Sequence, residues 1–136
     1  MTIYEQFIDT VKAVGNKDAA TIVFLWGDLG SGKTTFTKRL CEYLGLGIEI
    51  TSPTFTILKK YEFNSLGFEN LIHVDAYRLD SYDDLLKIKF DEYAKNPKNL
   101  IFIEWPSIIE HENITADINI RFLHGEGVDD RVITMD

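Results

Sequence analysis

The sequence contains little cysteine, few arginines and no long apolar run. Its 136 residues include one cysteine, Cys41, so no disulfide can form within the chain. No segment approaches the roughly 20 apolar residues that a membrane-spanning helix needs. Residues 1–5 lack the basic segment and the apolar core of a secretory signal. We therefore expect a cytoplasmic protein without a membrane anchor, in which Cys41 is a small packing residue.

Positive charge is also scarce. The chain has 14 Lys and Arg against 22 Asp and Glu, a formal net charge of −8, and it has no dense basic cluster. A protein that holds nucleic acid by itself neutralises phosphates with clustered Lys and Arg. The composition argues against such binding. It leaves two interpretations of the acidic surface open, contact with a basic protein partner and simple solubility.

One glycine-rich segment carries the strongest functional pattern. Residues 27–34, Gly-Asp-Leu-Gly-Ser-Gly-Lys-Thr, match G-x-x-x-x-G-K-[ST], the phosphate-binding loop of nucleoside triphosphatases. An apolar, β-rich segment at 21–26 precedes the motif, and a helical pattern at 35–44 follows it and stops at Gly45. This context favours a true phosphate loop over a glycine-rich turn with a solvated lysine.

Each residue type in the loop has a chemical task. The glycines let backbone N–H groups approach phosphate oxygens, and the start of the helix adds partial positive charge. Lys33 can reach the β and γ phosphates, and the Thr34 hydroxyl can bind Mg²⁺. The motif therefore predicts ATP or a similar triphosphate, with Mg²⁺, as ligands.

Apolar periodicity and turn residues predict the remaining elements. Besides the helix after the loop, we expect helices at 2–14, 80–90 and 91–95, the second capped by Asp80 or Ser81. We expect strands at 21–26, 48–50, 54–63, 71–75, 100–104, 117–122 and 131–135, the last two as an antiparallel pair. A turn is expected at 64–67. Strands alternate with helices in the first two thirds, which predicts one α/β domain over residues 1–136 with parallel strands.

Two acids end predicted buried strands. Asp75 follows residues 71–74, and Glu104 follows residues 100–103. Ligands of parallel α/β sheets lie at the carboxyl ends of strands, where an acid beside a phosphate loop commonly contacts Mg²⁺. Asp75 and Glu104 are thus candidate metal-binding or catalytic residues. One could bind the ion through water while the other orients the attacking water, and the pattern does not divide these roles.

Other residues near these motifs have more ordinary interpretations. His73, inside an apolar strand, is expected to be a packed histidine rather than a metal ligand. Trp105 either packs at a strand end or offers a stacking surface. Residues 51–54, Thr-Ser-Pro-Thr, read as an ordinary turn by spacing alone.

Four segments together resemble a known family. They are Gly-Asp-Leu-Gly-Ser-Gly-Lys-Thr-Thr-Phe at 27–36, Thr-Ser-Pro-Thr-Phe at 51–55, His-Val-Asp-Ala-Tyr-Arg-Leu at 73–79 and Ile-Glu-Trp-Pro at 103–106. In order and approximate spacing they are similar to the TsaE family of small bacterial ATPases, which act in tRNA threonylcarbamoyladenosine biosynthesis. The resemblance covers about residues 20–110. It implies a P-loop NTPase fold, a three-layer α/β/α arrangement with a mostly parallel sheet.

The resemblance also implies an activity and partners. It implies an ATPase that is weak alone and acts with the proteins TsaD and TsaB, resetting their complex after each cycle. TsaD would transfer the threonylcarbamoyl group, and this chain would meet tRNA only indirectly through the complex.

Residue roles carry over by position. Gly27, Gly30, Ser31, Gly32, Lys33, Thr34 and Thr35 would hold the phosphates of ATP. Thr34 and Glu104 would hold Mg²⁺, and Asp75 would stand in the Walker-B-like position, also near the metal. Thr54 would belong to a nucleotide-sensing loop, Trp105 would lie near the nucleotide, and Arg131 would contact its nucleoside end.

Two positions depart from the family pattern. Ser107 stands where the family usually has a second glutamate, and Lys89 stands where a glycine is common before residues 90–93. Three other functions remain alternatives to the ATPase. They are a small-molecule P-loop kinase, for which four scattered arginines are a poor supply, a GTP-binding switch, for which the Asn-Lys-x-Asp motif is absent, and a nucleotide-binding scaffold without turnover.

Overall fold

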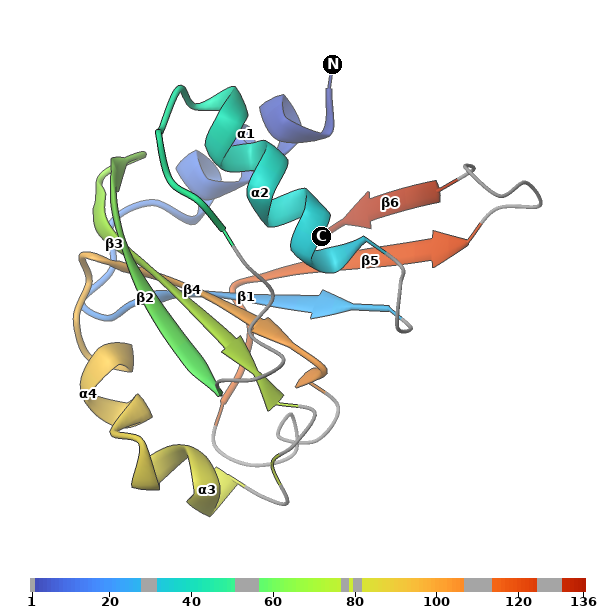
Figure 1. Ribbon diagram of the computed structural model, residues 1–136. Helices are drawn as coiled ribbons and strands as arrows, with labels where there is room; N and C mark the ends of the chain where they lie inside the picture. Colours follow the sequence, from blue (N-terminus) through green and yellow to red (C-terminus); the bar gives the residue numbers. More distant parts are fainter. Residues whose placement is uncertain are drawn as a thin grey trace.

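A twisted β-sheet forms the centre of the molecule (Figure 1). The structure, a computed structural model, describes residues 2–27, 32–50, 57–76, 79, 82–106, 114–124 and 131–136. Within them the sheet has six strands in the order β2-β3-β4-β1-β5-β6. The strands are β1 (Thr21–Trp26), β2 (Leu58–Ser65), β3 (Phe68–Asp75), β4 (Asn99–Glu104), β5 (Ile118–His124) and β6 (Arg131–Met135).

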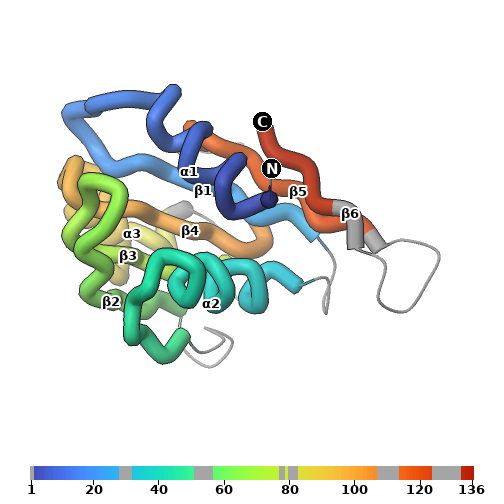
Figure 2. The backbone as a smooth tube through the Cα atoms, turned by 90° about the horizontal axis from the view of Figure 1, so that it is seen from above, coloured from blue at the N-terminus to red at the C-terminus, as the bar shows by residue number. Residues whose placement is uncertain are grey.

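The middle of the sheet is parallel and both edges are antiparallel. Strands β3, β4, β1 and β5 run in one direction, β2 is antiparallel to β3, and β6 is antiparallel to β5. Figure 2 shows β2 and β6 at opposite edges. The mostly parallel sheet and the antiparallel pair at the C-terminus are thereby confirmed.

Helices cover both faces of the sheet. Helices α1 (Ile3–Val14) and α2 (Lys33–Tyr43) lie on one face, and α3 (Tyr82–Lys87) and α4 (Phe90–Ala94) lie on the other (Figure 1). Each face has its own apolar cluster, one including Phe7 and Leu40, the other Leu85 and Phe90. The three-layer α/β/α arrangement is confirmed. No helix of the described residues has the length and apolar character needed to cross a membrane.

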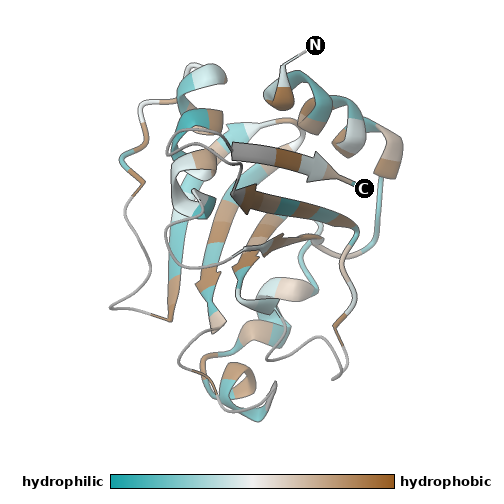
Figure 3. Cartoon of the chain, turned by 90° about the vertical axis from the view of Figure 1, so that its right-hand side faces the viewer, coloured by the Kyte–Doolittle hydropathy of each residue, from teal (hydrophilic) through white to brown (hydrophobic). Residues whose placement is uncertain are grey.

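Strand β4 shows why the sheet is buried on both sides. All six of its residues are buried, with Phe102 in the cluster under α1 and α2 and Ile101 and Ile103 in the cluster over α3 and α4. Side chains of a strand alternate between faces, so a strand covered by helices on both sides reads as a continuous apolar run. Hydrophobic residues accordingly gather on the central strands in Figure 3.

Cys41, the single cysteine of the chain, is a packing residue, as the sequence predicted. It lies in α2, is fully buried and belongs to the cluster under α1 and α2. Burial, with a smaller effect from Glu42, raises the pKa of the Cys41 thiol to about 11. The thiol is therefore protonated at neutral pH and unreactive.

Two sequence predictions between α2 and β3 need correction. Residues 48–50 do not form a strand, since they have no pairing partner among the described residues, although Ile50 packs in the core. The strand expected at 54–63 is shifted, because β2 spans Leu58–Ser65, and residues 54–56 lie outside the described part. The turn expected at 64–67 is narrower and consists of Leu66 and Gly67, both with left-handed backbone.

The helix expected at 80–90 ends earlier than its pattern suggested. Helix α3 stops at Lys87 and Phe90 begins α4, so the predicted boundary between the two helices is wrong. Lys89 lies between them with φ of 63°, in the left-handed region that interrupts a right-handed helix. Asp80 and Ser81, the expected caps, lie outside the described residues. Glycine, which the resembled family commonly has at position 89, is also the residue that adopts this left-handed conformation most easily.

Replacing Lys89 with glycine should stabilise the protein. The left-handed conformation costs a non-glycine residue about 1–2 kcal/mol, and glycine's greater freedom in the unfolded chain offsets part of that gain. We expect Lys89→Gly to raise the free energy of unfolding by about 0.5–1 kcal/mol in urea titrations. The matched control is Lys87→Gly, which removes the same side chain from α3 and should lower stability by about 1 kcal/mol. A loss of stability in both variants would contradict the strain at Lys89.

Candidate nucleotide site

Three strand ends and one helix start meet at the same edge of the sheet. Strand β4 ends at Glu104, which pairs in register with Asp75 at the end of β3 and with Leu25 near the end of β1. The backbone after β1 continues through Gly27, and α2 begins at Lys33 (Figure 1). The parallel pairing therefore brings the two predicted acids to adjacent positions beside the glycine-rich segment.

Glu104 is a buried acid with two hydrogen-bond partners on one oxygen. The Thr34 hydroxyl donates to its Oε2 at 2.9 Å, and His73 Nε2 lies 2.6 Å from the same atom. The side chain is mostly withdrawn from solvent, with 6% of Glu104 exposed. Burial acts to raise the pKa of Glu104, but the contacts with His73, Thr34 and the charge of Lys33 outweigh it and hold the pKa below its ordinary value. Glu104 is therefore a carboxylate at neutral pH.

His73 is part of the site, because it contacts Glu104, and the sequence did not predict this contact. It is fully buried in β3, and because a carboxylate only accepts hydrogen bonds, its Nε2 donates to Glu104. Its Nδ1 has no hydrogen-bond partner within the described part of the chain. The burial of His73 confirms the expectation of a packed histidine, but the sequence did not predict its hydrogen bond with Glu104.

The alternation of side chains along a strand is the pattern that could have indicated His73 as a residue of the site. Alternate residues of a strand face the same side, so His73 and Asp75 project toward the face on which α2 lies. The register pairs His73 with Phe102 and Asp75 with Glu104, which places all four side chains on that face. An apolar strand with a histidine two residues before a terminal acid is thus a recognisable pattern.

Lys33 is held in a buried position at the start of α2. Its Nζ donates to the Gly27 carbonyl at 2.6 Å and lies 3.8 Å from the centre of the Trp105 ring. Only 4% of Lys33 is exposed. A cation over an aromatic face is attracted by the ring's quadrupole, so Trp105 helps to hold the ammonium. Trp105 itself has φ of 60°, an uncommon conformation for a bulky residue directly after a strand.

Asp75 and the beginning of α2 complete the described part of the site. Asp75 is 6% exposed, and its backbone N–H donates to the Ile57 carbonyl at 2.9 Å. Gly32 caps α2 with φ of 101°, a conformation that suits glycine, and Thr35 follows on an exposed position. The N–H groups of the first helical turn thus stand at the edge that carries the two acids.

The remaining predicted residues are placed only in part. Gly30, Ser31 and Thr54 lie outside the described residues. Arg131 begins β6 and pairs with His124 at the carboxyl end of β5, two strands from β1. The backbone of Arg131 therefore lies at the carboxyl edge of the parallel strands, and its contact with a nucleotide stays a prediction.

The sequence profile described as "Threonylcarbamoyl adenosine biosynthesis protein TsaE" matches residues 3–133. The chain belongs to the TsaE family. This family is involved in the biosynthesis of threonylcarbamoyladenosine in tRNA, which confirms the resemblance carried by the four sequence segments.

Individual TsaE relatives support this assignment. The tRNA threonylcarbamoyladenosine biosynthesis protein TsaE of Bacillus subtilis is 36% identical over 131 residues, covering 93% of this chain and 78% of the relative. The protein of the same name from Treponema pallidum is 38% identical, covering 78% of this chain and 76% of its own. The one from Rickettsia conorii is 41% identical over 66% of this chain, which spans about half (49%) of that relative.

A solved structure shares the fold. The crystal structure of YdiB from Bacillus subtilis aligns with a TM-score of 0.63 and 29% identity, covering 99% of this chain and 80% of that one. The likeness fits the P-loop NTPase fold that the glycine-rich motif predicts.

The contact between His73 and Glu104 makes a prediction about stability. His73→Leu removes the donor and leaves a buried carboxylate short of one hydrogen bond, so it should lower the free energy of unfolding by about 1.5–3 kcal/mol. The same substitution should lower the free energy of unfolding less in a Glu104→Gln background, because the neutral amide there does not depend on the hydrogen bond from His73. Urea unfolding of the four proteins in this double-mutant cycle measures the coupling.

His73→Gln is the control, because its side-chain amide keeps an N–H donor and should recover part of the loss. Equal destabilisation by His73→Leu in both backgrounds would show that the histidine acts by packing alone.

Proposed function

We propose that this chain is a Mg²⁺-dependent ATPase that supports threonylcarbamoyladenosine modification of tRNA by binding and resetting a TsaB–TsaD complex. The observation that carries the proposal is the hydrogen bond from Thr34 to Glu104. It joins the start of the phosphate-loop helix to a strand-ending acid, beside a second acid, in a member of the TsaE family. This is the combination that triphosphate hydrolysis requires.

In this proposal the glycine-rich segment holds the phosphates. Backbone N–H groups from Gly27 and from Gly30 to Thr35 would face the phosphate oxygens, favoured by the partial positive charge at the start of α2. Lys33 would exchange the Gly27 carbonyl for oxygens of the β and γ phosphates. Because Lys33 is already buried against Trp105, it would bring a poorly hydrated, preorganised charge to the phosphates.

The side chains present suit Mg²⁺. The Thr34 hydroxyl and the carboxylates of Glu104 and Asp75 are the hard oxygen donors that this ion prefers. No group of three or more His, Cys, Asp or Glu within the described residues could hold a metal alone. That fits an ion which usually keeps waters and binds through one or two carboxylates together with substrate phosphates. When bound, Mg²⁺ would neutralise charge on the phosphates.

The two acids would have separate tasks. Glu104, kept ionised by His73 and Thr34, would serve with Thr34 in holding the ion. Asp75, in the Walker-B-like position, would contribute to the metal site or orient the attacking water. Thr54 would report the nucleotide state, and Trp105 and Arg131 would lie toward the rest of the nucleotide. His73 would act on the reaction only through Glu104.

Family membership and the charge of the chain support the proposed partners. A chain with net charge −8 would meet tRNA only indirectly, through TsaD and TsaB, in the cytoplasm. Activity would be weak alone because the productive arrangement is populated only when the partners dock.

The test is steady-state ATP hydrolysis with and without the TsaB–TsaD pair of the same organism. We expect a large increase on adding the pair, and a loss of at least about a hundredfold in kcat for Lys33→Ala, since a preorganised charge on the transferring phosphate is removed. Glu104→Gln and Asp75→Asn should also impair hydrolysis. The matched control is Glu62→Gln, a substitution at an exposed position of β2, which should leave hydrolysis unchanged.

Circular dichroism of each variant separates loss of activity from loss of folding. Normal partner-dependent turnover by Lys33→Ala would contradict the phosphate-loop assignment. ATP binding without turnover under any condition would instead indicate a nucleotide-binding scaffold.

A further inference from the structure

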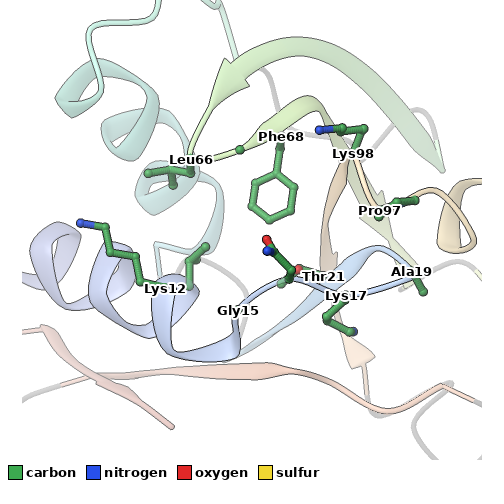
Figure 4. Close-up of a pocket in the computed structure, with 12 residues that line it drawn as sticks. Lys12, Gly15, Lys17, Ala19, Thr21, Leu66, Phe68, Pro97 and Lys98 are labelled. Carbon is green, nitrogen blue, oxygen red and sulfur yellow. The ribbon is translucent and has the colours of Figure 1, made fainter.

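A cavity lies at the end of the sheet opposite the candidate nucleotide site. It has a volume of about 620 Å³, opens to solvent, and is lined by the end of α1, the start of β1, the β2–β3 turn and the loop before β4 (Figure 4). Its walls include Val11, Leu66, Phe68 and Pro97. The volume lies within the range of about 300–1,000 Å³ that is usual for small-molecule pockets. We refer to it as the amino-edge cleft.

The amino-edge cleft is separate from the candidate nucleotide site. Thr21, which lines it, is the first residue of β1, whereas Gly27 follows the last residue of the same strand. Six extended residues span roughly 17–20 Å. A ligand in the cleft therefore could not touch the phosphate loop or the two acids.

The floor of the cleft contains an unused hydrogen-bonding group. Thr21 is 3% exposed and lines the cleft, and within the described residues no hydrogen bond of its hydroxyl is found. The one buried side-chain polar atom without a partner in that part of the chain is His73 Nδ1, so the Thr21 hydroxyl is accessible from the cleft. Figure 4 shows the Phe68 ring pointing toward Thr21 across the cleft. The cleft thus combines an aromatic wall with a polar group that can bind an acceptor or a donor.

The rim is basic although the whole chain is acidic. Lys12, Lys17 and Lys98 line the cleft, and no acidic residue is among the described residues that do so. Lys17 is neutralised by Asp117 at 2.6 Å, but no ion pair to Lys12 or Lys98 is found in the described part of the chain. The cleft is therefore a local positive region on a molecule of net charge −8.

Lys98 is the cation best placed to act with the aromatic wall. Its backbone is fixed, because its N–H donates to Asn96 Oδ1 at 2.9 Å and its carbonyl accepts from the N–H groups of Glu69 and Asn70. Glu69 follows Phe68 directly, so these bonds tie Lys98 to the strand that carries the ring. Figure 4 shows Lys98 beside Phe68, with Lys12 on the α1 side of the rim.

We propose that the amino-edge cleft binds a small organic anion with a flat apolar body, such as an aromatic carboxylate. The flat body would lie against Phe68 and the aliphatic walls, which favour apolar surface. The carboxylate would face Lys98, and a polar atom of the ligand would pair with the Thr21 hydroxyl. This site is independent of the proposed ATPase function.

A matched pair of probes tests the proposal. We would titrate the full chain with 2-naphthoate and with neutral 2-naphthamide, following backbone amides by ¹H–¹⁵N NMR. Both probes should shift the amides of Gly15, Gly67 and Lys98. The carboxylate should bind about two- to fivefold more tightly than the amide, the range expected for an exposed ion pair.

Three variants assign the contacts. Lys98→Gln should remove the preference for the carboxylate, and Thr21→Val should weaken both probes about two- to tenfold through the lost hydrogen bond. Lys87→Gln, which removes an exposed lysine from α3 on the other side of the molecule, should change nothing. Lys98 is exposed, so its substitution keeps the test decisive even if Thr21→Val disturbs folding.

Several outcomes would overturn the proposal. They are an absence of shifts up to the solubility limit of 2-naphthoate, shifts centred on Gly32 and Thr34 instead of the cleft, equal affinity for the acid and the amide, and an equal effect of Lys87→Gln and Lys98→Gln.

Discussion

The parallel pairing of β3, β4 and β1 is the constraint on which the rest of the molecule depends. Their register sets Asp75 beside Glu104 and Glu104 beside Leu25. A shift of one residue would turn each side chain to the opposite face, so the apolar residues of the two clusters and the two acids are positioned by the same pairing. Because both faces of β4 are buried, the packing of the core fixes that register strongly. The same packing therefore fixes the positions of the two acids.

The cost of this arrangement is a charged group inside the protein. Glu104 ionises despite its burial because it receives hydrogen bonds from Thr34 and His73 and lies near the charge of Lys33. Thr34 and Lys33 come from α2 and His73 comes from β3, so satisfying the carboxylate also ties the helix to the sheet. Removing one donor is therefore expected to disturb folding and chemistry together, and experiments on this site need stability measurements beside activity.

Charge is distributed unevenly between the two ends of the sheet. At the carboxyl edge, acids and Lys33 balance one another in a nearly buried cluster, whereas the amino edge carries lysines around an aromatic cleft. The net charge of the chain conceals both features. Such separation allows the two ends of one sheet to present two chemically different surfaces without interference between them.

The sequence by itself determined the identity of the elements and of the reactive groups. Hydrophobic runs, the glycine-rich motif and the strand-ending acids predicted the parallel sheet, the helix after the loop, and Asp75 and Glu104 at one edge, because these features depend on local periodicity and on a general rule of α/β sheets. The family resemblance added a glycine preference at position 89, where the chain adopts a left-handed conformation. Periodicity could not find that break, since it records only which residues are apolar.

Only the tertiary structure decided which groups touch. The bond from His73 to Glu104, the placement of Lys33 on Gly27 and Trp105, and the cleft between α1, β1 and β3 each join segments that lie far apart or face one another across the fold. The absence of a strand at 48–50 was likewise decided by the tertiary structure, because a strand forms only where a neighbouring strand offers hydrogen bonds. Such contacts depend on register and packing between elements, which a pattern within one segment does not contain.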